Sequence, residues 1–278
     1  MVNLLGKQGL AILNADNPEV LKLKNNTPAE VITYGFSENS DIRATDISFN
    51  YEEENIRGLS FKLNYKGTTL PIRLNGVLAR HQIYAALSAA ATGIYFGINL
   101  VEIGKNLEKF VSPCSRMNLL PGIKKTLIID DTYNSSPKSA IAALETLSEI
   151  KAPRKIVVLG DMLELGEKTE EGHQAVARKF LETKAHLFFA VGRRMQIAVS
   201  ELHQQGFNKN LFYYFKDPIS AGKKLQEIIQ EGDLILIKGS QGMRMEKIVE
   251  EIMAEPQKAK ELLCRQNKEW KEKEFKEI

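Results

Sequence analysis

This sequence of 278 residues has few of the side chains that usually bind metals or form disulfides. Its two cysteines, Cys114 and Cys264, lie far apart and have neither zinc-ligand spacing nor the pattern of a disulfide framework. The four histidines are scattered along the chain, so no metal-binding cluster is visible. We therefore expect two ordinary thiols in a reducing cytoplasm and assign no metal ligand.

Long apolar runs and a strong net charge are also missing. No run reaches the roughly 20 residues of a membrane-spanning helix, because residues 85–100, the longest candidate, are interrupted by polar residues and glycines. The start, MVNLLGKQG, lacks the apolar core and cleavage site of a secretory signal. A net charge of +3 gives no reason to expect nucleic acid as a partner. These features predict a cytoplasmic protein without a membrane span.

What the sequence does contain is the composition of a globular protein, with 43% apolar and 26% charged residues. The length allows two domains, and the Ser-Pro pair that begins at Ser112 marks a boundary. We predict a first domain over residues 1–112, a second over 113–254 and a charged helical tail over 255–278. Trp270, the only tryptophan, lies in this tail, as a loose cap on the domain surface or as a docking site for another chain.

The first domain is predicted to be mixed α/β. From residue 41 to 76 apolar and polar residues alternate, which predicts an antiparallel meander with a polar turn over 64–69. Asp16 or Asn17 suits the N-cap of a helix whose first turn contains Pro18. The other predicted elements are strands over 9–13 and 31–34 and helices over 81–98 and 101–110.

The sequence pattern changes in the second domain, where continuous apolar runs alternate with helical patterns. The predicted strands cover residues 126–130, 155–159, 187–191, 211–215 and 234–237. The predicted helices cover residues 138–149, 170–183, 196–205, 219–230 and 245–254. Five β-α units in series predict a parallel, doubly wound sheet whose strands are buried on both faces.

Polar clusters follow three of these strands, where an open parallel sheet binds its ligands. They are Asp130-Asp131-Thr132-Tyr133-Asn134, Gly160-Asp161-Met162-Leu163-Glu164-Leu165-Gly166 and Lys238-Gly239-Ser240-Gln241-Gly242. The N–H groups of the last cluster, together with the lysine charge, suit a phosphate or carboxylate. A carboxylate at a strand end suits ribose hydroxyls or an amine.

Each cluster also has a purely structural interpretation. Asp130, Asp131 or the serines at 135 and 136 can cap a helix, and Asp161 can form a turn. Lys238 can be an exposed lysine ahead of a helix. For any single cluster this interpretation is preferred, but three clusters at one sheet edge favour a binding site.

Several stretches resemble the Mur ligase family. IIDDTYNSSPKSAIAALETL, VVLGDMLELGEKTEEGHQAV and LIKGSQGMRMEKIVEEI resemble its C-terminal domain. LNADNP and ARHQIYAALSAAATGIYFGI resemble the second half of its central ATP-binding domain, and SRMNLLPG resembles the link between the two. The likeness covers residues 9–254. It implies an α/β fold in which a truncated Mur ligase central domain precedes a Rossmann-like, doubly wound, mainly parallel sheet.

The resemblance implies an ATP-dependent amide-bond ligase of peptidoglycan precursor synthesis, similar to those that add D-Ala-D-Ala to UDP-muramyl-tripeptide. In such ligases ATP phosphorylates a carboxylate, the incoming amine attacks the acyl phosphate, and Mg²⁺ neutralises the phosphates. The implied nucleotide-binding residues are Arg116 for the phosphates, Asp131 for the ribose, Tyr133 and Asn134 beside it, and Asn14, Asp16 and His81. The implied dipeptide-binding residues are Lys238 and Ser240, with Asp161 and Glu164 nearby. No catalytic residue is assigned.

The sequence departs from the family pattern in two places. It contains no G-x-x-x-x-G-K-[ST] motif, since Gly6-Lys7 is followed by Gln8. Where the family has His-Asn-x-x-Asn, whose asparagines contact adenine, this chain has His81-Gln82-Ile83-Tyr84-Ala85. Gln82 can still form hydrogen bonds, but Ala85 cannot.

The missing motif leads to three hypotheses. In the preferred one, the chain is the C-terminal half of a split ligase and needs a separate P-loop-bearing half with the UDP-binding domain. In the second, it is a catalytically inactive module that binds a dipeptide, a nucleotide or a partner protein. In the third, it is a decayed gene product. A sheet that lacks strands exposes an edge, which favours a partner chain.

Overall fold

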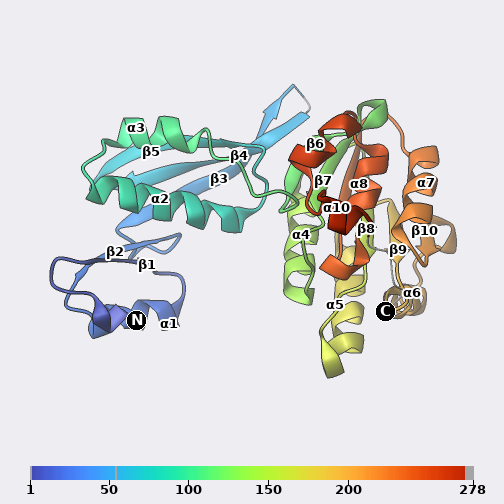
Figure 1. Cartoon of the computed structure of the whole chain (residues 1–278), viewed down its shortest axis with the longest axis horizontal. Coiled ribbons are helices and arrows are strands. Elements are labelled where there is room, and N and C mark those ends of the chain that lie inside the picture. The colour runs from blue at the N-terminus through green and yellow to red at the C-terminus, as the bar shows by residue number, and fades with distance from the viewer. Residues whose placement is uncertain (1, 54, 273–278) are drawn as a thin grey trace. The chain divides into compact units, whose positions relative to one another are not determined.

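The structure is a computed structural model that describes residues 2–53 and 55–272. It divides into two compact units, one ending at Val111 and the other beginning at Ser112 (Figure 1). Each unit is built on its own sheet. Within the described residues, none of the helices combines the length and the apolar character needed to cross a bilayer.

The first unit contains a five-stranded sheet in the order β1-β2-β3-β4-β5. Its strands are β1 (Leu10–Asn14), β2 (Glu30–Gly35), β3 (Ile42–Glu52), β4 (Asn55–Tyr65) and β5 (Thr68–Asn75). Strands β1 to β3 pair in parallel, and β3 to β5 form the predicted antiparallel meander. Alternate meander residues, including Phe61 and Leu63, share a core with the helix α2 (Ile83–Tyr95).

The helix cap, the helix and the turn predicted for this unit are present, but the predicted lengths of the helix and the turn differ from the observed ones. Asn17 caps the short helix α1 (Pro18–Leu21) by accepting hydrogen bonds from two backbone N–H groups. The helix α3 (Leu100–Leu107) begins earlier than predicted, because Asn99 caps its start, and it also ends before the predicted residue 110. The predicted turn over 64–69 is wrong in extent, since only Lys66 and Gly67 lie between β4 and β5. Both have positive φ, +45° and +78°, as a tight two-residue hairpin turn requires.

The second unit contains a six-stranded sheet in the order β10-β9-β8-β11-β7-β6. The five predicted strands are present and parallel: β7 (Leu127–Asp131), β8 (Arg154–Gly160), β9 (Leu187–Val191), β10 (Phe212–Phe215) and β11 (Asp233–Lys238). The intervening helices are α4 (Pro137–Glu149), α5 (Thr169–Glu182), α6 (Met195–Gln204), α7 (Pro218–Ile228) and α8 (Glu246–Ile252). The mainly parallel α/β prediction is confirmed.

The inner strands β7, β8, β9 and β11 are buried on both faces, as a doubly wound arrangement requires. One set of alternate residues, such as Ile235 and Ile237, shares a core with Ile248 and Val249 of α8. The other set faces different helices, since Phe188 of β9 contacts Phe180 of α5 with ring centroids 4.6 Å apart. The sheet therefore presents its strand ends, rather than its faces, to a ligand.

One strand and part of the tail were not predicted. The strand β6 (Asn118–Pro121) pairs antiparallel with β7 at the sheet edge, and its four residues with a terminal proline carry too weak a pattern to be recognised. After residue 254, α9 (Ala259–Leu262) and α10 (Lys268–Glu272) follow. The described part of the predicted helical tail therefore contains helices, and Ala259 and Leu263 are buried in the core of the second unit. Residues 273–278 of the predicted tail lie outside the described residues.

Candidate functional site

The carboxyl ends of three neighbouring strands, β8, β11 and β7, bring the three predicted polar clusters together. Lys238, the last residue of β11, is in register with Asp131 on one side and Leu159 on the other. A Cβ at Gly239 would lie 2.6 Å from the Met245 side chain and 3.2 Å from the Cα of Gly160. Glycine at this position therefore allows the loops after β8 and β11 to approach closely.

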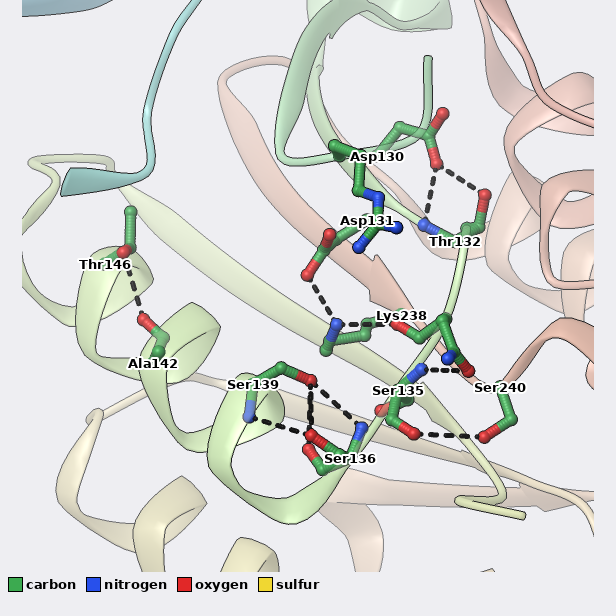
Figure 2. A network of polar contacts seen from close by, with 12 residues as sticks. Asp130, Asp131, Thr132, Ser135, Ser136, Ser139, Ala142, Thr146, Lys238 and Ser240 are labelled. Atoms are coloured by element: carbon green, nitrogen blue, oxygen red, sulfur yellow. Dashed lines mark hydrogen bonds and ion pairs between the residues drawn. The ribbon is translucent and has the colours of Figure 1, made fainter. Parts of the chain in front are cut away.

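The central contact of this edge is a buried ion pair between Lys238 and Asp131. The Lys238 ammonium donates to Asp131 Oδ2 at 2.6 Å (Figure 2). It also donates to the carbonyl of Asn134 at 2.8 Å. The lysine side chain is only 2% exposed, so its interpretation as an exposed lysine is wrong. The pair joins two residues that the family resemblance assigned to different ligands, and it fastens the loop after β7 to the end of β11.

Ser240 links the loops after all three strands. Its hydroxyl donates to the carbonyl of Ser135 at 3.2 Å and accepts from the backbone N–H of Leu163 at 2.8 Å. The side chain is buried. The helix α4 is capped by Ser136, which forms a capping box with Ser139 (Figure 2). The aspartates at 130 and 131 therefore serve other contacts.

Asp161 is a buried carboxylate that stabilises the start of α6. It accepts the backbone N–H groups of Arg194 at 3.1 Å and Met195 at 2.8 Å. Burial raises the pKa of its carboxyl, while the two N–H groups oppose that rise. Its carbonyl also accepts the N–H of Ser240 at 3.1 Å. Glu164, in contrast, is exposed and adopts a left-handed backbone conformation with φ +63°.

The two adjacent aspartates of β7 differ in environment. Asp130 is fully buried and accepts hydrogen bonds from the N–H of Thr132 at 3.1 Å, its hydroxyl at 2.7 Å and the hydroxyl of Ser115 at 2.8 Å. Burial raises the pKa of Asp130 to about 6, against these hydrogen bonds. Asp130 thus holds the β7 end to the segment that precedes β6, and Asp131 faces Lys238.

Tyr133 is the exposed aromatic group of this edge, with 42% of its surface accessible. The guanidinium of Arg116 lies 4.1 Å from its ring centroid, and that of Arg265 lies 5.7 Å from it. Arg116 and Tyr133 were both predicted, and the structure brings them together. Arg265 was missed, because a single arginine in a segment rich in Lys and Glu gives no distinguishing signal.

Neighbouring Asn134 shapes the same loop through both its side chain and its backbone. Its side-chain oxygen accepts the N–H of Ser135 at 2.9 Å, and its carbonyl accepts Lys238. The exposed guanidinium of Arg116, resting on the Tyr133 ring, suits an anionic group such as a phosphate.

Two of the three predicted residues of the first unit, Asn14 and Asp16, lie together, and the third, His81, lies on the turn before α2. Asn14 accepts the N–H of Asp16 at 2.9 Å. The Asp16 carboxylate accepts the N–H groups of Phe36 at 2.6 Å and Ser37 at 2.9 Å and the Tyr84 hydroxyl at 3.0 Å.

These hydrogen bonds shift the pKa values of both Asp16 and Tyr84. Burial opposes ionisation of Asp16, but the donors outweigh it and lower its pKa. Burial and the neighbouring carboxylate together raise the pKa of Tyr84 to about 12. His81 is exposed on the short turn before α2, and Ala85 on that helix is exposed as well.

The donor set of the second unit fits nucleotide phosphates better than a metal ion. Within residues 2–53 and 55–272, no group of three or more His, Cys, Asp or Glu side chains is placed to hold a metal. The carboxylate of Asp130 is buried and already accepts three hydrogen bonds, and that of Asp131 is paired with the Lys238 ammonium. Arg116 supplies exposed positive charge beside the Tyr133 ring, whereas the Arg265 side chain is only 4% exposed and is paired with Glu246.

Comparison with known proteins identifies relatives for both units. Residues 1–93 match the Mur ligase middle domain, and residues 115–241 match the Mur ligase glutamate ligase domain. The UDP-N-acetylmuramoyl-tripeptide–D-alanyl-D-alanine ligase of Bacillus subtilis (strain 168) is 29% identical over 257 residues, which are 92% of this chain and 54% of that protein. The chain spans about half the length of the curated relatives it matches.

Solved structures show the same partial likeness. A crystal structure of MurF from Acinetobacter baumannii matches with a TM-score of 0.74 and 26% identity, over 88% of this chain and 52% of that chain. MurF from Thermotoga maritima, solved in complex with ADP, matches with a TM-score of 0.71 and 20% identity, over 90% of this chain and 54% of that chain. The second match, at this identity, is a likeness of fold.

Proposed function

This chain belongs to the Mur ligase family, and from that premise we propose that it provides the C-terminal half of a MurF-like ligase. The whole enzyme would use ATP to join D-Ala-D-Ala to UDP-muramyl-tripeptide in cytoplasmic peptidoglycan precursor synthesis. The observation that supports this most is the edge where Lys238 and Ser240 fasten three strand-end loops under an exposed Tyr133 and Arg116.

On this proposal the chain binds the nucleotide through the loop after β7. Arg116 supplies positive charge to the phosphates, and the ring of Tyr133 supports its guanidinium. Asp131 accepts ribose hydroxyls. A carboxylate has about four acceptor sites, so Asp131 can do this while it holds Lys238.

The residues assigned to the dipeptide act mainly by placing backbone. Lys238, Ser240 and Asp161 are buried and direct their polar atoms at neighbouring loops. Their proposed role is to hold the segment that begins at Gly239 in a shape that receives the dipeptide. Glu164 is exposed, and on this proposal it is the side chain of this set that touches substrate directly.

These 278 residues contain no P-loop motif, so the proposal needs a P-loop-bearing N-terminal half with a UDP-muramyl-peptide site. That half would cradle the β- and γ-phosphates of ATP and hold Mg²⁺, whose charge would favour attack of the tripeptide carboxylate on the γ-phosphate. This chain would orient the nucleotide and the incoming amine.

The direct test is reconstitution. The purified chain is mixed with the N-terminal half of a MurF enzyme, and formation of UDP-muramyl-pentapeptide is followed by mass spectrometry with ATP, Mg²⁺ and D-Ala-D-Ala. We expect product only when both halves are present. The matched control is the same N-terminal half with its P-loop lysine replaced by alanine. A well-folded complex that makes no product would reject the ligase proposal.

Arg116→Ala tests the nucleotide contact within that assay. We expect KM for ATP to rise about tenfold, the scale of one charge-assisted contact. The stability of the isolated chain should change by no more than about 1 kcal/mol, because the lost cation–π contact lies on an exposed ring. Lys209→Ala is the control, since this exposed cation lies just before β10 at the opposite end of the sheet. An unchanged KM would remove Arg116 from the site.

A second candidate, a binding module without catalysis, is favoured by Ala85. Its exposed methyl group stands where the family pattern has an asparagine that contacts adenine. On this alternative, calorimetry detects binding of ADP or D-Ala-D-Ala while the reconstituted complex stays inactive. Absence of binding for both ligands would reject the small-molecule form of this candidate.

A further inference from the structure

The segment over residues 263–272, which we call the C-terminal segment, contacts the loop that carries Tyr133. The guanidinium of Arg265 donates to the carbonyl of Thr132 at 3.0 Å and to the carbonyl of Tyr133. The backbone N–H of Cys264 donates to the Ser115 hydroxyl at 3.2 Å. The C-terminal segment is therefore hydrogen-bonded both to the segment before β6 and to the loop after β7.

Arg265 is tied at the same time to a buried carboxylate on another element. Glu246, the first residue of α8, is 1% exposed and pairs with Arg265 at 3.1 Å and with Arg244 at 2.6 Å. The Arg265 side chain is itself only 4% exposed. One guanidinium thus joins the loop after β7 to the helix that follows β11.

The only tryptophan completes this arrangement. The guanidinium groups of Arg244 and Arg265 lie 5.2 Å and 5.7 Å from the centroid of the Trp270 ring. Arg265 also lies 5.7 Å from the ring of Tyr133, on which Arg116 rests. Trp270 therefore has ring contacts within its own unit, next to the candidate site.

We propose that Arg265 is a positioning residue, by which the C-terminal segment holds the Thr132–Tyr133 backbone so that the Tyr133 ring faces Arg116. The geometry requires an arginine, because its planar fork carries five donors and can reach two carbonyls and a carboxylate together. A lysine at this position keeps the charge beside Glu246 but cannot hold both carbonyls. The consequence for nucleotide binding rests on the proposed function, whereas the hold on the loop does not.

Amide hydrogen exchange of the full chain, read by mass spectrometry, tests the hold directly. The Tyr133 N–H donates to the carbonyl of Ser115 at 3.1 Å, so its protection reports whether the loop is closed. In Arg265→Lys we expect exchange of the peptide over 131–135 to rise about tenfold relative to the β11 peptide, which measures global opening. Lys271→Ala is the control, because this exposed cation of the same segment pairs with Glu250 instead.

Two further variants protect this test against misfolding. Trp270→Leu leaves the Glu246 pairs in place and should raise loop exchange by a smaller factor than Arg265→Lys. The variant Arg265→Met removes the guanidinium while Glu246 keeps its pair with Arg244, so it opens the loop without leaving Glu246 as an unmatched charge. If loop and β11 peptides change in parallel in every variant, Arg265 is only a stabilising residue and the proposal is overturned.

Calorimetric titration with ADP separates this proposal from the proposed function. If the wild-type chain binds ADP, Arg265→Lys should weaken binding about tenfold while Lys271→Ala does not. Equal affinity in all three proteins, together with a loosened loop, would overturn the link between the loop and the nucleotide. If the wild-type chain does not bind ADP, nucleotide binding by this chain alone fails, and the exchange experiment still decides the positioning role.

Discussion

Strand β11 has a buried charged side chain at each end, and the two side chains are neutralised by different kinds of partner. At its start, Asp233 is 1% exposed and accepts a two-pronged contact from Arg154 at 2.7 Å and 2.6 Å. The Gln230 N–H adds a third bond at 2.8 Å. At its end, Lys238 holds Asp131 and the carbonyl of Asn134, both on a loop beside an exposed tyrosine.

The difference lies in what each pair holds. The Arg154–Asp233 pair fixes β11 to β8, its neighbour in the sheet, and the arginine also donates to the carbonyl of Ile228 at the end of α7. The Lys238–Asp131 pair fixes a loop whose outer side chains remain available to a ligand. A buried ion pair costs desolvation wherever it lies. The pair at the carboxyl end has this same cost, but it also defines the shape of the candidate site.

Replacing Lys238 by alanine should have the largest effect. It leaves Asp131 buried without its ammonium partner, a change that typically costs about 3–5 kcal/mol. We expect this loss in urea unfolding monitored by circular dichroism. The double variant Lys238→Met with Asp131→Leu should recover most of the stability and none of the ligase activity in the reconstituted assay. If the double variant is as unstable as the single one, the pair is not the source of the loss.

Asp130 is a buried carboxylate of a third kind, because its hydrogen-bond donors are hydroxyl groups and a backbone N–H rather than a cation. Its pKa of about 6 is raised above the ordinary value of 3.8, so the folded state binds the proton more tightly than the unfolded state. Stability from this group is fully present below pH 4 and falls as the pH rises to about 6, by up to about 3 kcal/mol.

The measurement is the free energy of unfolding between pH 4 and 7 for the wild-type chain and Asp130→Asn. The variant lacks the titrating group, so its stability relative to the wild type should rise with pH across this window. A difference that stays constant with pH would show that Asp130 titrates normally despite its burial.

Asp233→Asn should have the smallest effect of the three. The amide keeps one acceptor for Arg154 but loses the charge and half of the fork, which should cost about 2 kcal/mol. Asp233 lies at the amino end of β11, remote from the loops that follow β7, β8 and β11 at their carboxyl ends. The activity per folded complex should therefore not change. Reduced activity without reduced stability would contradict the division between a structural end and a functional end.

Much of the fold could be predicted because its signals are local. Continuous apolar runs identified the five parallel strands, and alternation identified the meander, since burial on two faces or one determines those patterns. The strand β6 escaped because four residues with a terminal proline are too short for either pattern. The length of the hairpin turn was overestimated because Asn64 and Thr69 are polar, although their side chains bond across the two strands at 2.7 Å.

The candidate site was predictable in its location but not in its contacts. Strand ends can be recognised locally, whereas Lys238 meets Asp131 across 107 positions and Asp161 meets Met195 across 34. Such pairings depend on the order of strands in the sheet, which periodicity does not reveal. The same reason hid Arg265, whose partner Thr132 is 133 positions away.

The segment that leaves the first unit is anchored at once to the candidate site. Ser112 donates to the carbonyl of Arg116 at 2.8 Å, and Ser115 donates to Asp130 and accepts the N–H of Tyr133. The residues that connect the two units and the loop that carries Tyr133 therefore share the same hydrogen bonds, so the linker between the domains is also a structural part of the candidate site.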